Sequence, residues 1–475
     1  MTGQNAKRRS LPGLIRGLGL WAAAAVVVGS MIGQAVFLVT SDMARELGSP
    51  TKVLLLWIVG GLVVLCGALC YAELGAAMPE AGGDYVYLSR GLNPVWGFLF
   101  GWTSAMILKP APAAVIVAGI VRLSAFVLPS ITKPIFTGHL QLPLLSRPYQ
   151  FTLSGAQPMA VTVIIVVTAI NYFAVRAVGR FQLVLTALKV TGLVAIVILG
   201  LIPGKVIAVE PAASLPAPTH SPIEALLTAL VPVMLAYNGF QWLGNVGGEI
   251  VNPRTNLPRA AILGTAVVIT LYLLTNWIYF HILGLSAVAQ SQHVASDVLT
   301  VLVGGSGAKW LTAFMILSAF GSLHAGFLTG PRISYAMARE GNFFSFAKFI
   351  HFKFHSPTKA LIFQGCMATL LVLTGTYQEL YSYDMFATWA FFALTAVALF
   401  RLRCKEPGLP RPYRVWGYPW TPLIFGVAAL AISLNLFLVR PVRSCIGLAM
   451  ILLGIPFFRH WRQRTPLIRA SIAPS

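Results

Sequence analysis

VVVGSMIGQAVFLVT, residues 26–40, lies inside an uncharged run (residues 17–41) that is long enough to cross a bilayer. The middle of this run, Gly29-Ser30-Met31-Ile32-Gly33, contains two glycines, which lower the cost of unwinding a helix. In lipid, unwound backbone is tolerated only where it is buried in protein or lines a water-filled cavity. This weak point therefore predicts a place where backbone groups meet a polar ligand.

The composition is that of a membrane protein with many crossings. The chain has 475 residues, of which 57% are hydrophobic and 10% are charged, whereas a soluble domain carries about 25% charged residues. The apolar segments are too long and too continuous for barrel strands, which alternate over about ten residues. The predicted fold class is therefore an all-α polytopic membrane protein.

Twelve hydrophobic segments are predicted to cross the plasma membrane, with both chain ends on the cytoplasmic side. Their approximate spans are residues 17–41, 51–78, 93–128, 159–175, 181–202, 223–246, 257–283, 306–336, 360–377, 380–400, 418–439 and 444–458. In this orientation roughly 23 of the 34 Lys and Arg residues are cytoplasmic and roughly 8 are external, as the positive-inside rule requires. The net charge of +21 therefore indicates orientation rather than a nucleic-acid partner.

The sixth predicted span has a weak point like that of the first, at Ala236-Tyr237-Asn238-Gly239. Weakened first and sixth helices are what an inverted repeat of two five-helix halves produces, with substrate bound between the discontinuous helices. Close packing through small residues is the alternative explanation for each break taken alone. The predicted organisation is a cytoplasmic tail (1–16), a first repeat of helices 1–5 (17–202), an external loop (203–222), a second repeat of helices 6–10 (223–400), a basic internal loop with helices 11 and 12 (401–460), and a second cytoplasmic tail (461–475).

Four blocks of sequence resemble the L-type amino-acid transporters of the amino acid–polyamine–organocation superfamily. They are GALCYAELGAAMPEAGGDYVYL (67–88), GEIVNPRTNLPRA (248–260), FGSLHAGFLTGPRISYAMAREGNFF (320–344) and GLPRPYRVWGYPWTP (408–422). The blocks stand in family order with family spacing. The resemblance implies the LeuT-type fold, a 5+5 inverted repeat followed by two further helices, in which helices 1 and 6 are discontinuous.

A broken helix offers partners for both charged groups of an amino acid. The second half-helix presents backbone N–H groups to a carboxylate, and the first half-helix ends in carbonyls that accept from an ammonium. The resemblance implies a carboxylate site at the N–H groups of Gly33, Gln34 and Ala35, and an ammonium site near the carbonyls of Met31, Leu235 and Asn238. Ser30, Ile32, Tyr237 and Gly239 complete the expected substrate-binding set.

The chain departs from the family pattern at three positions. The usual Gly-Ser-Gly turn is Gly33-Gln34-Ala35, Leu235 stands where helix 6 has an aromatic gate, and His324 replaces an asparagine of helix 8. These departures leave the side chain of the substrate open. They also leave open an amine, a polyamine or a modified amino acid as the substrate.

Two polar residues within the predicted helices are further candidates for substrate contact. Lys109 precedes two prolines in ILKPAPAA, so a kink whose carbonyls bind the ammonium is the alternative to substrate contact. His324 is isolated from other metal-binding residues, and a hydrogen-bonded packing role is its alternative. Acidic residues are not expected at mid-bilayer: Asp84 is placed on the internal side and Asp384 near an external helix end.

Lys189 is the clearest ionisable residue within a predicted span. It lies about 12 Å along helix 5, where a lysine costs roughly 2.5–3.5 kcal/mol to insert, so it is expected to have a function. The alternative is that it snorkels to the inner interface, although its side chain barely reaches that far. By resemblance, it lies beside helices 1 and 8, where sodium-coupled relatives hold an ion. Its ammonium is then expected to replace that cation, bound to Ser322 and to carbonyls around Ala25. This arrangement predicts transport that does not require sodium.

The sequence therefore predicts a sodium-independent amino-acid transporter that works by exchange (antiport) or facilitated flux through alternating access. A transporter of amines or polyamines and a transport-inactive amino-acid receptor are the alternatives. An enzyme is disfavoured, because no paired carboxylates or activated nucleophile appear at membrane depth. The expected partners are a small-molecule substrate and the lipid bilayer, with no nucleic acid, cofactor or metal; the sequence does not predict the oligomeric state.

Overall fold

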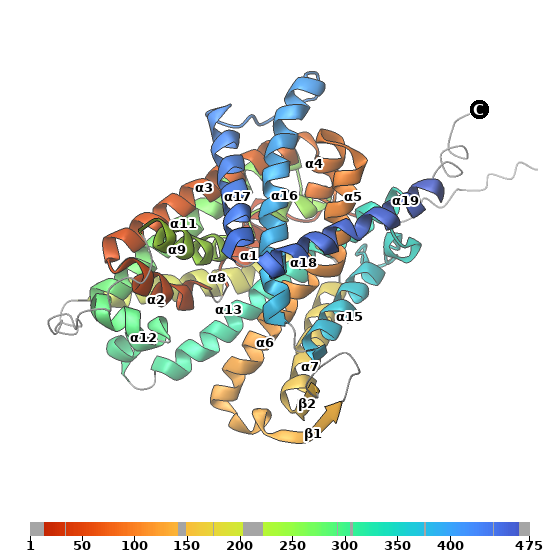
Figure 1. The fold of residues 1–475 in the computed structure, drawn as a ribbon. Coiled ribbons are helices and arrows are strands. Elements are labelled where there is room, and N and C mark those ends of the chain that lie inside the picture. Colours follow the sequence, from red (N-terminus) through yellow and green to blue (C-terminus); the bar gives the residue numbers. More distant parts are fainter. Residues whose placement is uncertain are drawn as a thin grey trace, which may run out of the picture.

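The computed structural model describes residues 14–33, 35–140, 149–173, 175–202, 222–291, 293–304, 307–374, 377–439 and 441–464. Within this part of the chain, eight helical segments are long and apolar enough to cross a membrane. Shorter apolar helices accompany them, and each of the twelve predicted spans coincides with one or more helices. The protein is therefore a helical, polytopic membrane protein (Figure 1).

The helices follow one another along the chain with short connections. The first ten are α1 (Leu20–Met31), α2 (Ala35–Leu47), α3 (Pro50–Ala77), α4 (Asp84–Gly91), α5 (Pro94–Thr103), α6 (Pro110–Val127), α7 (Ala156–Tyr172), α8 (Val175–Gly200), α9 (Pro222–Ala236) and α10 (Trp242–Asn245). The others are α11 (Pro253–Gln290), α12 (Val294–Val303), α13 (Gly307–Thr329), α14 (Pro331–Arg339), α15 (Thr358–Thr374), α16 (Tyr377–Lys405), α17 (Trp420–Val439), α18 (Pro441–Leu452) and α19 (Gly454–Arg464).

Both helices that were predicted to be discontinuous are interrupted. The first span divides into α1 and α2, and Ile32 between them has an extended backbone (φ −73°, ψ 91°). The sixth span divides into α9 and the short α10, with Gly239 at φ 129° between them. Because residues with a side chain rarely adopt this φ, glycine at position 239 allows the chain to turn there.

One part of the structure departs from the all-α prediction. Strands β1 (Pro134–Leu140) and β2 (Tyr149–Ser154) pair antiparallel within the connection between α6 and α7. The hairpin lies at the lower edge of the molecule in Figure 1, beside the ends of α6 and α7. The hydropathy pattern identified only long apolar spans, so it carried no information about these two short strands.

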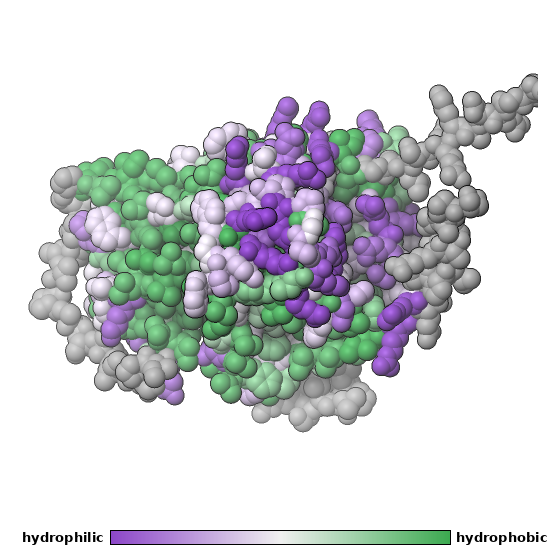
Figure 2. Space-filling view, turned by 90° about the horizontal axis from the view of Figure 1, so that it is seen from above, coloured by the Kyte–Doolittle hydropathy of each residue, from purple (hydrophilic) through white to green (hydrophobic). Residues whose placement is uncertain are grey.

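Helix α1 lies at the centre of the bundle and packs against α8, α11 and α13 (Figure 1). Its contact with α8 is very close at Gly29, where a Cβ atom would lie 2.0 Å from Nε2 of Gln182. Gly29 is therefore required for packing. Figure 2 shows one face of the molecule, where hydrophilic residues gather over the middle and hydrophobic residues cover most of the remainder.

A buried ion pair joins α14 to the segment that follows α10. Arg332 of α14 donates from Nε to Oε1 of Glu249 at 2.7 Å and from NH2 to Oε2 at 3.1 Å, and both side chains are almost fully buried. The backbone oxygen of Glu249 also accepts from the amides of Gly17 and Leu18 at 2.8 and 3.0 Å. A parallel bridge joins Leu18 to Ile250. The segment after α10 is thus tied to the start of α1.

The first prediction concerns this ion pair. Glu249→Gln leaves the Arg332 guanidinium buried without its counter-charge, which costs about 3–5 kcal/mol in a buried pair. We expect the thermal unfolding midpoint of the purified protein in detergent to fall by several degrees. The matched control is Asp42→Asn, because the Asp42–Arg45 pair is exposed and exposed pairs contribute about 0–1 kcal/mol. Equal midpoints for the two variants would contradict the role assigned to the buried pair.

Candidate substrate site

The two interrupted helices meet at their breaks. Ser30 of α1 donates through Oγ to the carbonyl of Gly239 at 3.0 Å, or to that of Val27 at 2.9 Å in its own helix. A Cβ atom at position 239 would lie 2.9 Å from the backbone carbon of Ser30, so only glycine allows this approach. The hydroxyl of Tyr272 lies between the last carbonyls of the two half-helices, 2.8 Å from that of Met31 and 3.2 Å from that of Ala236.

A row of polar side chains from α8 binds the carbonyls of α1. Gln182 and Thr186 donate to the carbonyl of Ala25 at 3.3 and 3.0 Å. One turn further, Nζ of Lys189 lies 2.8 Å from the carbonyl of Gly29 and 2.6 Å from that of Ile32.

The Lys189 ammonium also donates to Oγ of Ser322 in α13, at 2.8 Å. Ser322 itself lies 2.9 Å from the carbonyls of Gly29 and Ile32. Lys189 is fully buried, and its three contacts join α8, α13 and the end of α1. The carbonyls that it reaches are not those around Ala25, because Gln182 and Thr186 already occupy that position.

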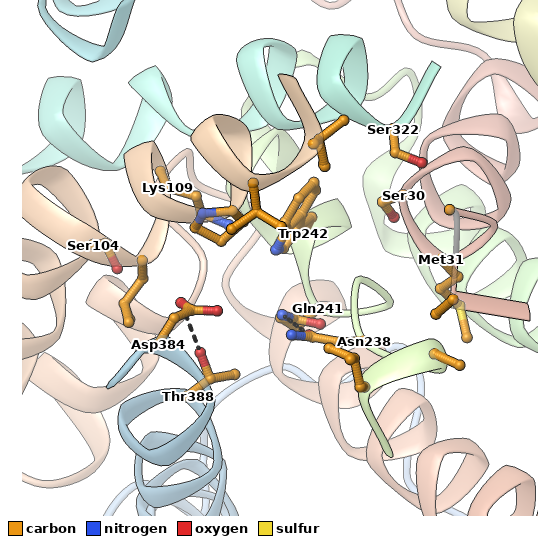
Figure 3. Close-up of a pocket in the computed structure, with 18 of the residues that line it drawn as sticks. Ser30, Met31, Ser104, Lys109, Asn238, Gln241, Trp242, Ser322, Asp384 and Thr388 are labelled. Atoms are coloured by element: carbon orange, nitrogen blue, oxygen red, sulfur yellow. Dashed lines mark hydrogen bonds between the residues drawn. The ribbon is translucent and has the colours of Figure 1, made fainter. Parts of the chain in front are cut away.

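A cavity of about 280 Å³ lies beside the two breaks. Its lining residues come from both interrupted helices and from α4, α5, the π-helical turn Ser104–Leu108, α6, α13 and α16. Figure 3 shows two polar ends. Ser30, Met31 and Ser322 lie at one end, and Ser104, Lys109, Asp384 and Thr388 lie at the other, with Asn238, Gln241 and Trp242 between them.

Most of the predicted substrate-binding residues line this cavity. They are Ser30, Met31, Gly33, Ala35, Leu235 and Asn238, together with Lys109 and Ser322. Gln34 lies outside the described residues. The roles expected of these residues toward a ligand remain predictions.

Three of the predicted residues are not placed on the cavity. Ile32 is fully buried and its carbonyl binds Lys189. Tyr237 points away, toward α3, where its hydroxyl donates to the carbonyl of Trp57 at 3.1 Å. Gly239 has its carbonyl bound to Ser30 and its amide bound to the side chain of Gln241.

His324 also lies away from the cavity. Its Nδ1 lies 2.6 Å from Oε1 of Gln182, and its ring packs edge-on against Phe181. His324 lies on the buried face of α13 and is directed toward α8. These surroundings match the hydrogen-bonded packing role that was the alternative to substrate contact.

The prolines after Lys109 explain how the lysine reaches the cavity. Pro110 lacks an N–H group and its ring would clash with the carbonyl four residues earlier. The helix before Pro110 widens into a π-helical turn at Ser104–Leu108, and Lys109 is the residue that follows this turn. Such turns are frequent at functional sites. The ammonium of Lys109 lies 4.1 Å from the ring centre of Trp242.

The sequence analysis placed Asp84 on the internal side and Asp384 near an external helix end, and it did not identify either as a cavity residue. Asp84 and Asp384 are 1% and 2% exposed, and both line it. Asp384 lies about two turns inside α16, because that helix begins at Tyr377. The recurrence of polar residues at 384, 388 and 395 along one helix would have indicated an inward-facing polar stripe. Gln241 and Trp242 were also missed. They come just after the predicted break, and the sequence analysis considered no residue of the sixth span beyond Gly239.

The second prediction concerns Lys189. Lys189→Met removes three hydrogen bonds from a charged donor, each worth about 1.5–3 kcal/mol, and leaves the end of α1 without its buried partner. We expect uptake of substrate to fall by about tenfold or more. The measurement is initial uptake rate in proteoliposomes, with Lys52→Met at the exposed start of α3 as the matched control. A Lys189→Met protein with the wild-type rate would contradict this assignment.

Comparisons with known proteins agree with this architecture. The sequence model of the amino acid permease family matches residues 18–458. The chain is 32% identical to the large neutral amino acids transporter small subunit 2 of Mus musculus, over 94% of this chain and 82% of that protein. It is 29% identical to the Asc-type amino acid transporter 1 of Mus musculus, with the same two coverages.

A third relative is the b(0,+)-type amino acid transporter 1 of Mus musculus, which is 29% identical over 94% of this chain and 89% of its own length. The family match covers nearly the whole chain, including both interrupted helices and the cavity between them. The chain therefore belongs to the amino acid permease family, and it is an amino-acid transmembrane transporter rather than an enzyme.

Proposed function

We propose that this protein is a sodium-independent amino-acid exchanger or facilitator that holds the α-amino and α-carboxyl groups of its substrate between the two interrupted helices. The observation that carries the proposal is the direct contact between the breaks: Oγ of Ser30 bonds the carbonyl of Gly239 beside a 280 Å³ cavity. Twelve membrane crossings, a 5+5 inverted repeat, cytoplasmic chain ends and a plasma-membrane location belong to the same proposal.

The start of α2 suits the carboxylate. The first amides of a helix have no partner within the helix, and the helix dipole favours a negative charge there. Gly33 and Ala35 both line the cavity at this point. Carbonyls at the ends of α1 and α9 are the corresponding partners for the ammonium, and the Tyr272 hydroxyl holds these two ends at a fixed separation.

Sodium independence rests on Lys189. A sodium ion at the end of a broken helix would need oxygen ligands, and the available oxygens of Gly29, Ile32 and Ser322 all lie within hydrogen-bond distance of the lysine ammonium. The protein thus carries its own positive charge at this position.

Replacing external sodium with N-methylglucamine is expected to leave the uptake rate unchanged. An uptake rate that falls when sodium is removed would contradict the proposal.

Alternating access needs a barrier on each side of the cavity. Leu235 of α9 lines the substrate cavity and also a second cavity of about 440 Å³, which is further lined by Asp42, Glu46 and Arg443. Leu235 therefore separates the two spaces and is the proposed external gate. At the proposed cytoplasmic end, the Arg332–Glu249 pair and the Leu18–Ile250 bridge close the bundle.

The third prediction distinguishes a transporter from a receptor that binds without transport. Purified protein is screened against amino acids, amines and polyamines by thermal stabilisation, where a ligand at 100 times its dissociation constant adds about 2.7 kcal/mol. Ligands that stabilise are then tested for counterflow in proteoliposomes. We expect an amino acid both to stabilise and to exchange. Stabilisation without flux would support a receptor, and stabilisation by amines alone would support an amine transporter.

The fourth prediction tests the position of the carboxylate. A Cβ atom at Gly33 would have only Oγ of Ser322 nearby, at an ordinary contact distance of 3.7 Å, so a side chain can start at this position without a clash. Gly33→Leu is expected to fill the space in front of α2 and to abolish ligand stabilisation and uptake. Gly19→Leu is the control, because nothing lies within 4 Å of its Cβ position. Wild-type affinity in the Gly33→Leu protein would refute the placement.

A further inference from the structure

The cavity has a second polar end, formed by Lys109 and Asp384, that lies away from the helix breaks (Figure 3). Lys109 is 8% exposed and Asp384 is 2% exposed, so neither side chain is solvated as a surface residue would be. A buried charge is costly unless it is paired or hydrogen-bonded. The hydrogen-bond and ion-pair partners of these two groups within the protein therefore decide how much bonding capacity they retain for a ligand.

Neither group is fully satisfied by its described neighbours. The ammonium of Lys109 contacts the face of Trp242, but it has no hydrogen bond or ion pair with another described residue, although Asp384 and Asp84 attract it electrostatically. Asp384 accepts one long hydrogen bond, from Oγ1 of Thr388 at 3.5 Å. A carboxylate has roughly four acceptor positions and an ammonium has three donors, so both retain unused capacity toward the cavity.

Asp84 provides the contrast on the same cavity. Its carboxylate accepts from the hydroxyl of Tyr71 and, at 2.8 Å, from Oγ1 of Thr395. These bonds join α4 to α3 and α16, so Asp84 has a structural role that its partners explain. Lys109 and Asp384 lack such partners, and they do not form an ion pair with each other in the described structure.

From this arrangement we infer that Lys109 and Asp384 form a side-chain subsite for amino acids whose side chain both accepts and donates hydrogen bonds, above all a carboxamide. The inference rests on the proposed function, because the breaks must hold the α-amino and α-carboxyl groups. A carboxamide oxygen accepts from the Lys109 ammonium, and its NH₂ group donates to the Asp384 carboxylate. One neutral group thus satisfies both charges.

Other side chains fit this pair less well. A cationic side chain that reaches Asp384 also meets the charge of Lys109, and an anionic one that reaches Lys109 also meets that of Asp384, so each attraction is offset by a repulsion. An apolar side chain leaves both charged groups without a partner once it has displaced water, and sites built around buried polar groups discriminate strongly against such ligands. Asparagine and leucine make the cleanest comparison, because their side chains branch at the same atom and have the same number of non-hydrogen atoms.

The test is counterflow of radiolabelled L-asparagine and L-leucine in proteoliposomes containing the full-length protein. In the wild-type protein kcat/KM for asparagine is expected to exceed that for leucine by about tenfold or more. Asp384→Asn and Lys109→Met are each expected to lower this ratio by about tenfold, because the first replaces a charged hydrogen-bond acceptor with a neutral one and the second removes a charged donor. Glu80→Gln and Lys52→Met, which change exposed residues that line neither of the two cavities, are the matched controls.

The outcomes separate the subsite from the proposed function. Wild-type protein that exchanges leucine as well as or better than asparagine overturns the subsite and leaves the transporter proposal standing, and this readout needs no variant to fold. An asparagine-to-leucine ratio that stays unchanged in both cavity variants, with thermal midpoints like those of the controls, overturns it as well. Wild-type protein that exchanges no amino acid contradicts the proposed function and the inference together.

Discussion

The hydrogen bonds from Lys189 to the end of α1 are the interaction on which the rest of the site depends. A helix that ends in the middle of a membrane protein exposes carbonyls that water cannot solvate. The Lys189 ammonium binds two of these carbonyls, at Gly29 and Ile32, and fixes α13 to the same point through Ser322. Because the end of α1 is held there, Gly33 and Ala35 at the start of α2 line the cavity.

The two glycines of the first span serve different purposes. Gly29 has no room for a side chain, because α8 approaches it closely with Gln182 and Thr186. Gly33 has ample room, and it leaves open the space in front of α2. One glycine therefore allows the helices to pack, and the other keeps the proposed carboxylate site accessible. The weak point in the sequence is thus both a packing contact and a break.

The sequence was sufficient to predict the helical membrane fold, the two interruptions and the family. Long apolar spans and helix-weakening residues are local properties, so they can be recognised without knowing the tertiary structure. The hairpin β1–β2 and the direction of Tyr237 and His324 could not be predicted, because strand pairing and side-chain direction depend on neighbours distant in sequence. Asp384 was misplaced because an acidic residue near a predicted helix end was assumed to face the water.

The central claim is that the paired breaks hold the charged groups of an amino acid. An experimental structure of the protein with its amino-acid substrate bound tests this most directly. The account predicts density for the carboxylate at the amides that begin α2 and for the ammonium at the carbonyls that end α1 and α9. Helices that run without interruption through both positions, or a substrate bound away from them, would contradict it.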